Sequence, residues 1–161
     1  MLVGADGEEI ESLAFSTAPL EARARLTEWF GTQPVTTETE PTHYCAESGG
    51  PIVTDAWGDD FLIVHTGTLW AHYDVRFAAY VSGAAVGGLD MEAFDGSAVG
   101  DPPEALLAAL PSRPGAFSEE EPGLKRIYFD VPNAYYSAYA YALKGGPINQ
   151  IIAPCALEES C

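Results

Sequence analysis

Two runs of strand-forming residues stand close together in Ile52-Val-Thr-Asp-Ala-Trp-Gly-Asp-Asp-Phe-Leu-Ile-Val-His-Thr66. Ile52–Trp57 and Phe61–Thr66 are rich in β-branched and aromatic residues, which favour strands. Gly58-Asp59-Asp60 between them has the composition of a tight turn. The sequence therefore predicts a β-hairpin here, and with it an antiparallel sheet.

A helix and a third strand are expected on either side of this hairpin. Pro19–Phe30 carries its apolar residues mostly on one helical face, with Ser16 or Thr17 as cap, proline in the first turn and a glycine directly after its end. Residues 31–42 are rich in Thr, Glu and Pro, which is typical of a loop or an edge strand. Trp70–Ser82 follows the hairpin as a longer third strand.

The same order of elements returns in the second half of the chain. A helix is predicted at Asp101–Leu110, with Asp101 as its cap, Pro102 in its first turn and Pro111 as its stop. A loop rich in Gly, Pro and Glu is expected to run from there through Gly123. Three strands should follow, at Leu124–Val131, Tyr135–Leu143 and Ile148–Ala153.

These elements predict an α+β fold made of two degenerate helix-then-three-strand repeats, with antiparallel sheets and the helices packed on one side. Residues 1–85 are the first helix-plus-sheet repeat and residues 86–161 the second, together forming one compact unit. The two copies agree in the order of their elements far better than in residue identity. Duplication of one helix-plus-sheet unit is therefore a hypothesis that rests on the order of the elements.

Charge is the most uneven feature of the composition. The chain has 24 acidic and 7 basic residues, a net charge of -17 at neutral pH. Such a surface repels nucleic acid and anionic membranes. No apolar stretch reaches the roughly 18 to 20 residues that a bilayer span requires. We expect neither a nucleic-acid partner nor a membrane span.

Cysteine placement bears on the compartment. Cys155 and Cys161 bracket the last residues of the chain, where a disulfide would act as a local staple; the alternative pairs Cys45 with either of them. The first residues show no signal peptide, yet Asp6-Gly7-Glu8-Glu9 resembles the acidic tether that follows a removed leader. We expect an extracytoplasmic protein, secreted or anchored to the cell envelope, and a lipid anchor upstream would fit. A cytoplasmic location is the alternative.

Tyrosine is concentrated in the second half of the chain. Five of the eight tyrosines lie between Tyr128 and Tyr141. Alternation along the strand predicted from Tyr135 places Tyr135, Tyr139 and Tyr141 on one face and several alanines on the other. The alanine face suits close packing against a helix, so the tyrosine face is a candidate binding surface. Trp70 and Tyr73, or Trp57 across the hairpin, would extend it. Tyrosines that simply cover a solvated sheet face are the competing interpretation.

Motifs for catalysis or metal binding are missing from the sequence. It has no Gly-x-Ser-x-Gly turn, no cysteine with a histidine partner at a recognisable spacing and no phosphate-cradling loop. His65 and His72 fall on opposite parities of neighbouring predicted strands, and Asp90-Met-Glu-Ala-Phe-Asp-Gly96 lacks the calcium-loop pattern. We therefore expect no enzymatic activity, no catalytic residues, no metal site and no cofactor.

Two short segments carry a resemblance to known proteins. Gly96-Ser-Ala-Val-Gly-Asp-Pro-Pro-Glu-Ala-Leu-Leu-Ala-Ala-Leu-Pro111 resembles a segment of secreted and lipid-anchored actinobacterial proteins of unknown function, and Phe15-Ser-Thr-Ala-Pro-Leu-Glu-Ala22 looks like its counterpart in the first half. The tandem plan is similar to that of the β-lactamase inhibitor protein, whose halves present a concave sheet to an enzyme. That family implies a disulfide in each half, whereas the first half here has one cysteine. Inhibition of β-lactamase is not implied.

Three classes of function follow. The leading interpretation is a non-enzymatic extracytoplasmic module that binds a protein or envelope partner through an aromatic sheet face. An intracellular, acidic, immunity or antitoxin-like inhibitor of a basic toxin is the alternative, because opposite charge favours such a complex. A small-ligand-binding domain with a pocket between the halves is the third.

Overall fold

The computed structural model describes the backbone of residues 2–3, 9–11, 13–40, 51–65, 76–92, 96–109, 117–121, 123–130, 137–143 and 145–153. Side chains are described for most of these residues; in β9, β10 and the first part of β11 they are described only at Ile127 and Ala140.

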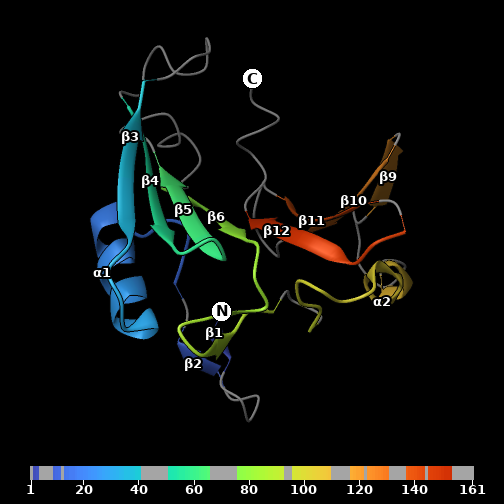
Figure 1. Cartoon of the computed structure of the whole chain (residues 1–161), viewed down its shortest axis with the longest axis horizontal. Helices are drawn as coiled ribbons and strands as arrows, with labels where there is room; N and C mark the ends of the chain where they lie inside the picture. Colours follow the sequence, from blue (N-terminus) through green and yellow to red (C-terminus); the bar gives the residue numbers. More distant parts are fainter. Residues whose placement is uncertain are drawn as a thin grey trace.

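An α+β architecture results, with antiparallel strands and two described helices (Figure 1). The helices are α1 (Pro19–Phe30) and α2 (Pro103–Ala109). The main sheet contains β3 (Val35–Thr39), β4 (Ile52–Trp57), β5 (Phe61–His65), β6 (Ala78–Val81), β9 (Phe117–Glu121), β10 (Leu124–Asp130), β11 (Ser137–Leu143) and β12 (Ile148–Ala153). Two small pairs lie outside it: β1 (Leu2–Val3) with β2 (Glu9–Glu11), and β7 (Ala85–Val86) with β8 (Leu89–Asp90).

The strand order of the main sheet is symmetric about its centre. It runs β3-β4-β5-β6-β12-β11-β10-β9, so the last strand of the first half pairs with the last strand of the second. The central contact is short, with Ile151 opposite Val81, Ile152 opposite Tyr80 and Ala153 opposite Ala79. Every other neighbouring pair joins strands of the same half. We call α1 with β3–β6 the first half and α2 with β9–β12 the second half.

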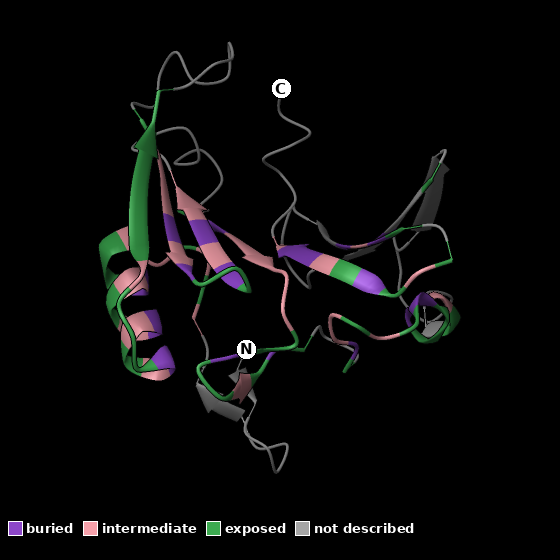
Figure 2. Cartoon of the chain, in the orientation of Figure 1, coloured by how far each residue is buried: buried purple, intermediate pink, exposed green. Residues whose placement is uncertain are grey.

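Both helices cover the same face of this sheet. Leu26 of α1 packs in a buried cluster with Phe61, and Leu106 of α2 packs in a second cluster with Ile151. Phe61 and Ile151 are both cross-strand partners of Val81, so the three side chains share one face, and Val81 contacts both clusters. Figure 2 shows buried positions alternating with intermediate ones along the first part of β5. The opposite face carries no described helix, and we call it the helix-free face.

Helix α1 has the predicted bounds, but its start differs from the prediction. Ser16 and Thr17 do not cap it: the N-cap position is Ala18, which makes no side-chain hydrogen bond, and proline opens the first turn. Proline has no backbone N–H and a φ already set for a helix, so it removes part of the need for a cap. The end is as expected, because Gly31 adopts the left-handed conformation at φ 67°.

Helix α2 begins later than predicted. It begins at Pro103, whereas Asp101 was expected as its cap. The carboxylate of Asp101 instead accepts a hydrogen bond from the backbone N–H of Ala98 at 2.8 Å, which closes the turn before the helix. The carbonyl of Asp101 accepts a hydrogen bond from the N–H of Ile148 at 2.9 Å. Asp101 therefore holds this loop against β12.

The predicted hairpin and antiparallel sheet are confirmed: β4 pairs with β5 across the expected turn, with Trp57 opposite Phe61. The count of strands per half is wrong, because each helix is followed by four strands in the main sheet. The additional strands are β3 and β9, at the two ends of the strand order. Of the expected strand Trp70–Ser82, the structure describes only β6, and residues 66–75 lie outside the described chain. Duplication itself stays a prediction.

Candidate functional site

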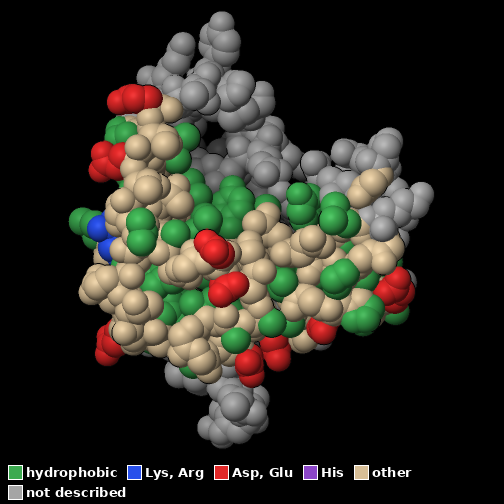
Figure 3. Space-filling view, viewed as in Figure 1, with side chains coloured by type: hydrophobic (Ala, Val, Ile, Leu, Met, Phe, Trp, Pro, Cys, Tyr) green, Lys and Arg blue, Asp and Glu red, His purple; other side chains and the backbone are tan. Residues whose placement is uncertain are grey.

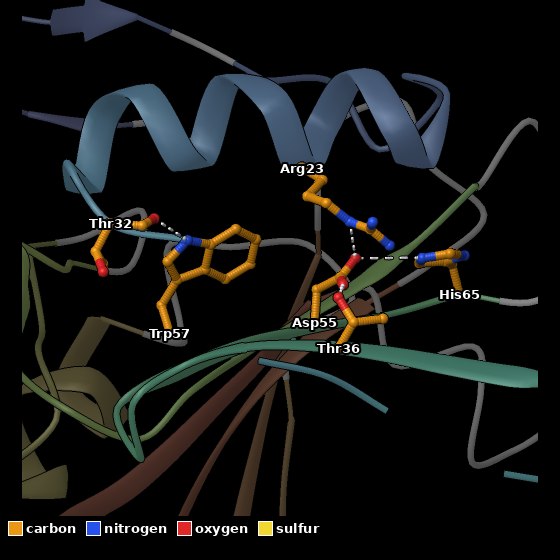
Figure 4. A network of polar contacts seen from close by, with 6 residues as sticks. All are labelled: Arg23, Thr32, Thr36, Asp55, Trp57 and His65. Carbon is orange, nitrogen blue, oxygen red and sulfur yellow. Dashed lines mark hydrogen bonds and ion pairs between the residues drawn. The ribbon is translucent and has the colours of Figure 1, made fainter. Parts of the chain in front are cut away.

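A polar network lies between α1 and the sheet, on the helix-covered face (Figure 4). Its centre is Asp55 of β4, whose side chain is 0% exposed. Arg23 of α1 donates from Nε to Oδ2 of Asp55 at 2.8 Å, and Thr36 of β3 donates from Oγ1 to Oδ1 at 2.5 Å. Both carboxylate oxygens of Asp55 are therefore engaged, one by a helix and one by a neighbouring strand.

Burial explains why Asp55 needs these partners. An ionised carboxylate without compensation in a protein interior costs several kcal/mol. The guanidinium of Arg23 supplies the opposite charge, and the Thr36 hydroxyl supplies a second donor. Arg23 keeps 29% of its side chain exposed, so the network lies at the rim of the helix–sheet contact. The arrangement ties α1 to β3 and β4.

His65 of β5 is the third neighbour of the carboxylate. Its Nε2 lies 3.4 Å from Oδ2 of Asp55, an ion-pair distance, yet this buried atom makes no hydrogen bond within the described residues. Burial lowers the pKa of His65 below 6.5, Asp55 opposes this change, and Arg23 adds to it. The net direction is downward, so His65 is neutral at pH 7 and the contact with Asp55 is weak.

The chemistry available to this network is limited. Both oxygens of Asp55 already accept hydrogen bonds, so the carboxylate is poorly placed to act as a general base. No group of three or more His, Cys, Asp and Glu side chains arranged to hold a metal ion lies among the described residues. Nearby, Trp57 donates from Nε1 to the carbonyl of Thr32 at 3.1 Å, just beyond the end of α1. These contacts fix the helix on the sheet, and we assign the network a structural role.

The helix-free face offers a different kind of site. Tyr80 of β6 and Tyr141 of β11 pack around Ile152 of β12, and both tyrosines remain partly exposed. Beside them, Gln150 donates from Nε2 to Oγ of Ser82 at 2.9 Å, bridging β12 and the end of β6. Figure 3 shows hydrophobic side chains in the hollow between the strands of the first half and those of the second half. Aromatic rings with polar groups beside them are typical of interface anchors.

The predicted binding residues reach this face only in part. The expectation that Trp57 extends the surface is wrong, because Trp57 is buried in the cluster under α1, on the helix-covered face. Tyr141 belongs to the cluster with Tyr80 and Ile152. Tyr139 pairs with Ile152 in the backbone register, and nothing is described of its side chain. Outside the described residues lie Tyr135, Trp70, Tyr73, Cys45, Cys155 and Cys161, so the proposed disulfides and the extension of the tyrosine surface stay predictions.

Sequence reasoning missed Tyr80, Ile152 and Gln150 as members of this surface. Their position comes from the central pairing of β6 with β12, which joins the two halves of the chain. Alternation gives the face of a residue within its own strand but not which strand becomes its neighbour. The signal that was present is Tyr80 itself, an aromatic residue within the predicted third strand.

A shallow depression lies between the start of α2 and the turn before β12. It is lined by Gly100, Pro102, Pro103, Glu104, Gly145, Gly146 and Pro147. Glu104 is the one charged side chain in this lining. Specific small-ligand sites have several convergent polar groups in an apolar cleft, and this depression lacks them.

Comparisons of the chain with protein family models, with curated proteins and with solved structures found no match. Among the described helices, none combines the length and hydropathy that crossing a bilayer requires. Function is therefore inferred from the residues of the chain itself.

Proposed function

We propose that this protein is a non-enzymatic binding module that holds a protein partner against the helix-free face of its sheet. One observation carries the proposal: α1 and α2 both cover the opposite face, and this leaves partly exposed Tyr80 and Tyr141 around Ile152 at the centre of the sheet. Tyrosine offers large, rigid contact area at low conformational cost, which is why it is enriched at interfaces.

The charge of the chain favours a basic partner. A net charge of -17 attracts a cationic protein over long range and repels acidic ones. The symmetric strand order supports the tandem plan expected from the sequence. The partner is an envelope-associated or extracellular protein if the chain is exported, and a basic toxin if the chain is a cytoplasmic immunity-like protein.

A binding test separates the two faces. Basic proteins from the producing cell's envelope and from its cytoplasm would be captured on the wild-type chain, and each affinity measured by calorimetry. Tyr80→Ala and Tyr141→Ala should each weaken the specific complex by at least about tenfold, as expected for aromatic anchors. The matched control is Leu20→Ala on α1, which is 71% exposed on the helix-covered side. A partner that binds both tyrosine variants normally and is lost with Leu20→Ala would reject the proposal.

Thiol counting separates the two compartments. Intact mass would be measured before and after alkylation, with and without reduction, on protein purified without reductant. One disulfide with one free thiol among the three cysteines supports export. Three free thiols support the cytoplasmic, immunity-like alternative.

A further inference from the structure

The outer edge of β3 is a second exposed surface, distinct from the helix-free face. β3 is the first strand in the order of the main sheet and pairs with β4 alone among the described strands. All five of its residues are exposed, including those on the side that α1 covers elsewhere, and Figure 2 shows the strand exposed along its whole length. Strands at a sheet edge carry unpaired backbone N–H and C=O groups that can accept another strand.

The sequence of β3 favours an extended backbone although none of its side chains is buried. Val35, Thr36, Thr37 and Thr39 are β-branched, and Val35 is 68% exposed. Thr36 donates to the buried carboxylate of Asp55, which in turn binds Arg23. One edge of the strand is therefore fixed by pairing with β4 and by the Thr36–Asp55 hydrogen bond, while its other edge lies at the end of the main sheet. A preformed edge lowers the entropic cost of adding a strand.

Charge selects what this edge can accept. Glu38 lies within β3 and Glu40 directly follows it, and no Lys or Arg occurs from Gly31 to Glu40. Figure 3 shows acidic side chains at the upper left, where Figure 1 draws β3. A second copy of the chain would bring the same carboxylates and a further net charge of -17 to the contact. An extended segment with Lys or Arg complements the edge.

We infer that the free edge of β3 binds an extended, basic segment of another protein by adding it to the sheet as a further strand. Main-chain hydrogen bonds to β3 supply affinity, and ion pairs with Glu38 and Glu40 select basic segments over neutral or acidic ones. This edge site does not include Tyr80 or Tyr141. Strand addition at β3 and the proposed binding at the helix-free face can therefore be tested separately.

A peptide probe tests the inference on the full chain. The probe is a capped peptide, Thr-Lys-Val-Lys-Val-Lys-Thr, with a second peptide that carries proline in place of the central lysine as its backbone control. Amide hydrogen exchange should slow in residues 35–39 when the first peptide binds, and should stay unchanged with the proline peptide, because proline breaks strand pairing. Protection of β3 by both peptides equally, or by neither, overturns the inference.

Two charge variants test the selectivity. Glu38→Lys should weaken binding of the lysine peptide about three- to tenfold, the size expected when a solvent-exposed ion pair is replaced by repulsion. Glu28→Lys makes the same change on an exposed position of α1 and should leave the affinity unaltered. Equal losses in the two variants would mean that net charge alone attracts the peptide. Protection of β3 that rises with protein concentration, without peptide, would mean that the occupant is a second copy. Either result overturns the inference.

Discussion

The two halves of the molecule have mirrored strand orders but different interiors. The first half buries an aromatic cluster in which Phe30 lies 5.2 Å from Phe61 and 5.6 Å from Trp57, ring centroid to ring centroid. It also buries the charged carboxylate of Asp55. The described core of the second half is aliphatic: Leu106, Ile127, Ala140, Ile148 and Ile151. The mirrored strand order is thus common to both halves, while the residues of the described cores and their polarity differ.

The aromatic cluster should be the most sensitive part of the first half. Phe61 is 6% exposed and contacts both Phe30 and Trp57. Phe61→Ala should lower the free energy of unfolding by about 3–5 kcal/mol, through lost burial and the cavity left behind. Urea denaturation measures this, with exposed Leu20→Ala as a control that changes stability by less than about 0.5 kcal/mol. A loss below about 1 kcal/mol for Phe61→Ala would contradict the assignment of this cluster as core.

The ion pair between Arg23 and buried Asp55 is a second feature of the first half. Arg23→Met should lower the free energy of unfolding by about 3 kcal/mol, the lower part of the usual range because Arg23 is partly exposed and water can reach the site. The double variant Arg23→Met, Asp55→Leu should regain part of this loss, since no buried charge is then left alone. Denaturation of the single variants Arg23→Met and Asp55→Leu and of the double variant gives the coupling free energy. Single-variant losses that simply add in the double variant would show that the two side chains do not interact.

Matched isoleucines compare the packing of the two cores directly. Ile63 in the first half is 0% exposed and Ile127 in the second is 1% exposed. Ile63→Val and Ile127→Val should each lower the free energy of unfolding by about 1 kcal/mol, because each removes one buried methyl group. If Ile127→Val alone were close to neutral by denaturation, the second core would be loosely packed, and the likeness of the halves would stop at strand order.

The smallest expected effect concerns pH and His65. Burial lowers its pKa in the folded protein below 6.5, so the unfolded chain binds this proton more readily. The free energy of unfolding therefore falls as pH falls from about 6.5 through the lowered pKa, and the contribution of His65 is complete above 6.5. Between about pH 7 and pH 5, His65→Gln should lose less stability than wild type. His43 and His72 are present in both proteins, so the difference isolates His65. Parallel pH curves would refute the lowered pKa.

Sequence pattern predicts the inner elements better than the edges. α1, β4 and β12 have the predicted bounds, Pro19–Phe30, Ile52–Trp57 and Ile148–Ala153. Each is rich in apolar residues, and each has buried positions. β3 is predicted only as loop or edge-strand material and β9 as loop. Val35–Thr39 has no buried face, and Phe117–Glu121 contains three consecutive glutamates, so neither shows an apolar alternation.

The candidate sites, too, could be predicted from the sequence only in part. Alternation along β11 predicts that its alanines face a helix, and Ala140 does lie in the buried cluster with Leu106 of α2. The importance of Asp55 is invisible in the sequence, where it resembles the solvated carboxylates of the adjacent turn. Its partner Arg23 is 32 positions away, and only the packing of α1 on β4 brings them together. The binding role of the tyrosines stays a prediction.

The short β6–β12 contact also has a consequence for how the chain folds. Apart from this central pair, each neighbouring pair in the main sheet joins strands within one half, and these local pairings can form early at low loop-closure cost. Pairing Val81 with Ile151 instead closes a loop that contains α2 and β9–β11, and it places partly buried Val81 in contact with both core clusters. We expect two locally formed halves to dock late, with the contacts of Val81 to both clusters formed last.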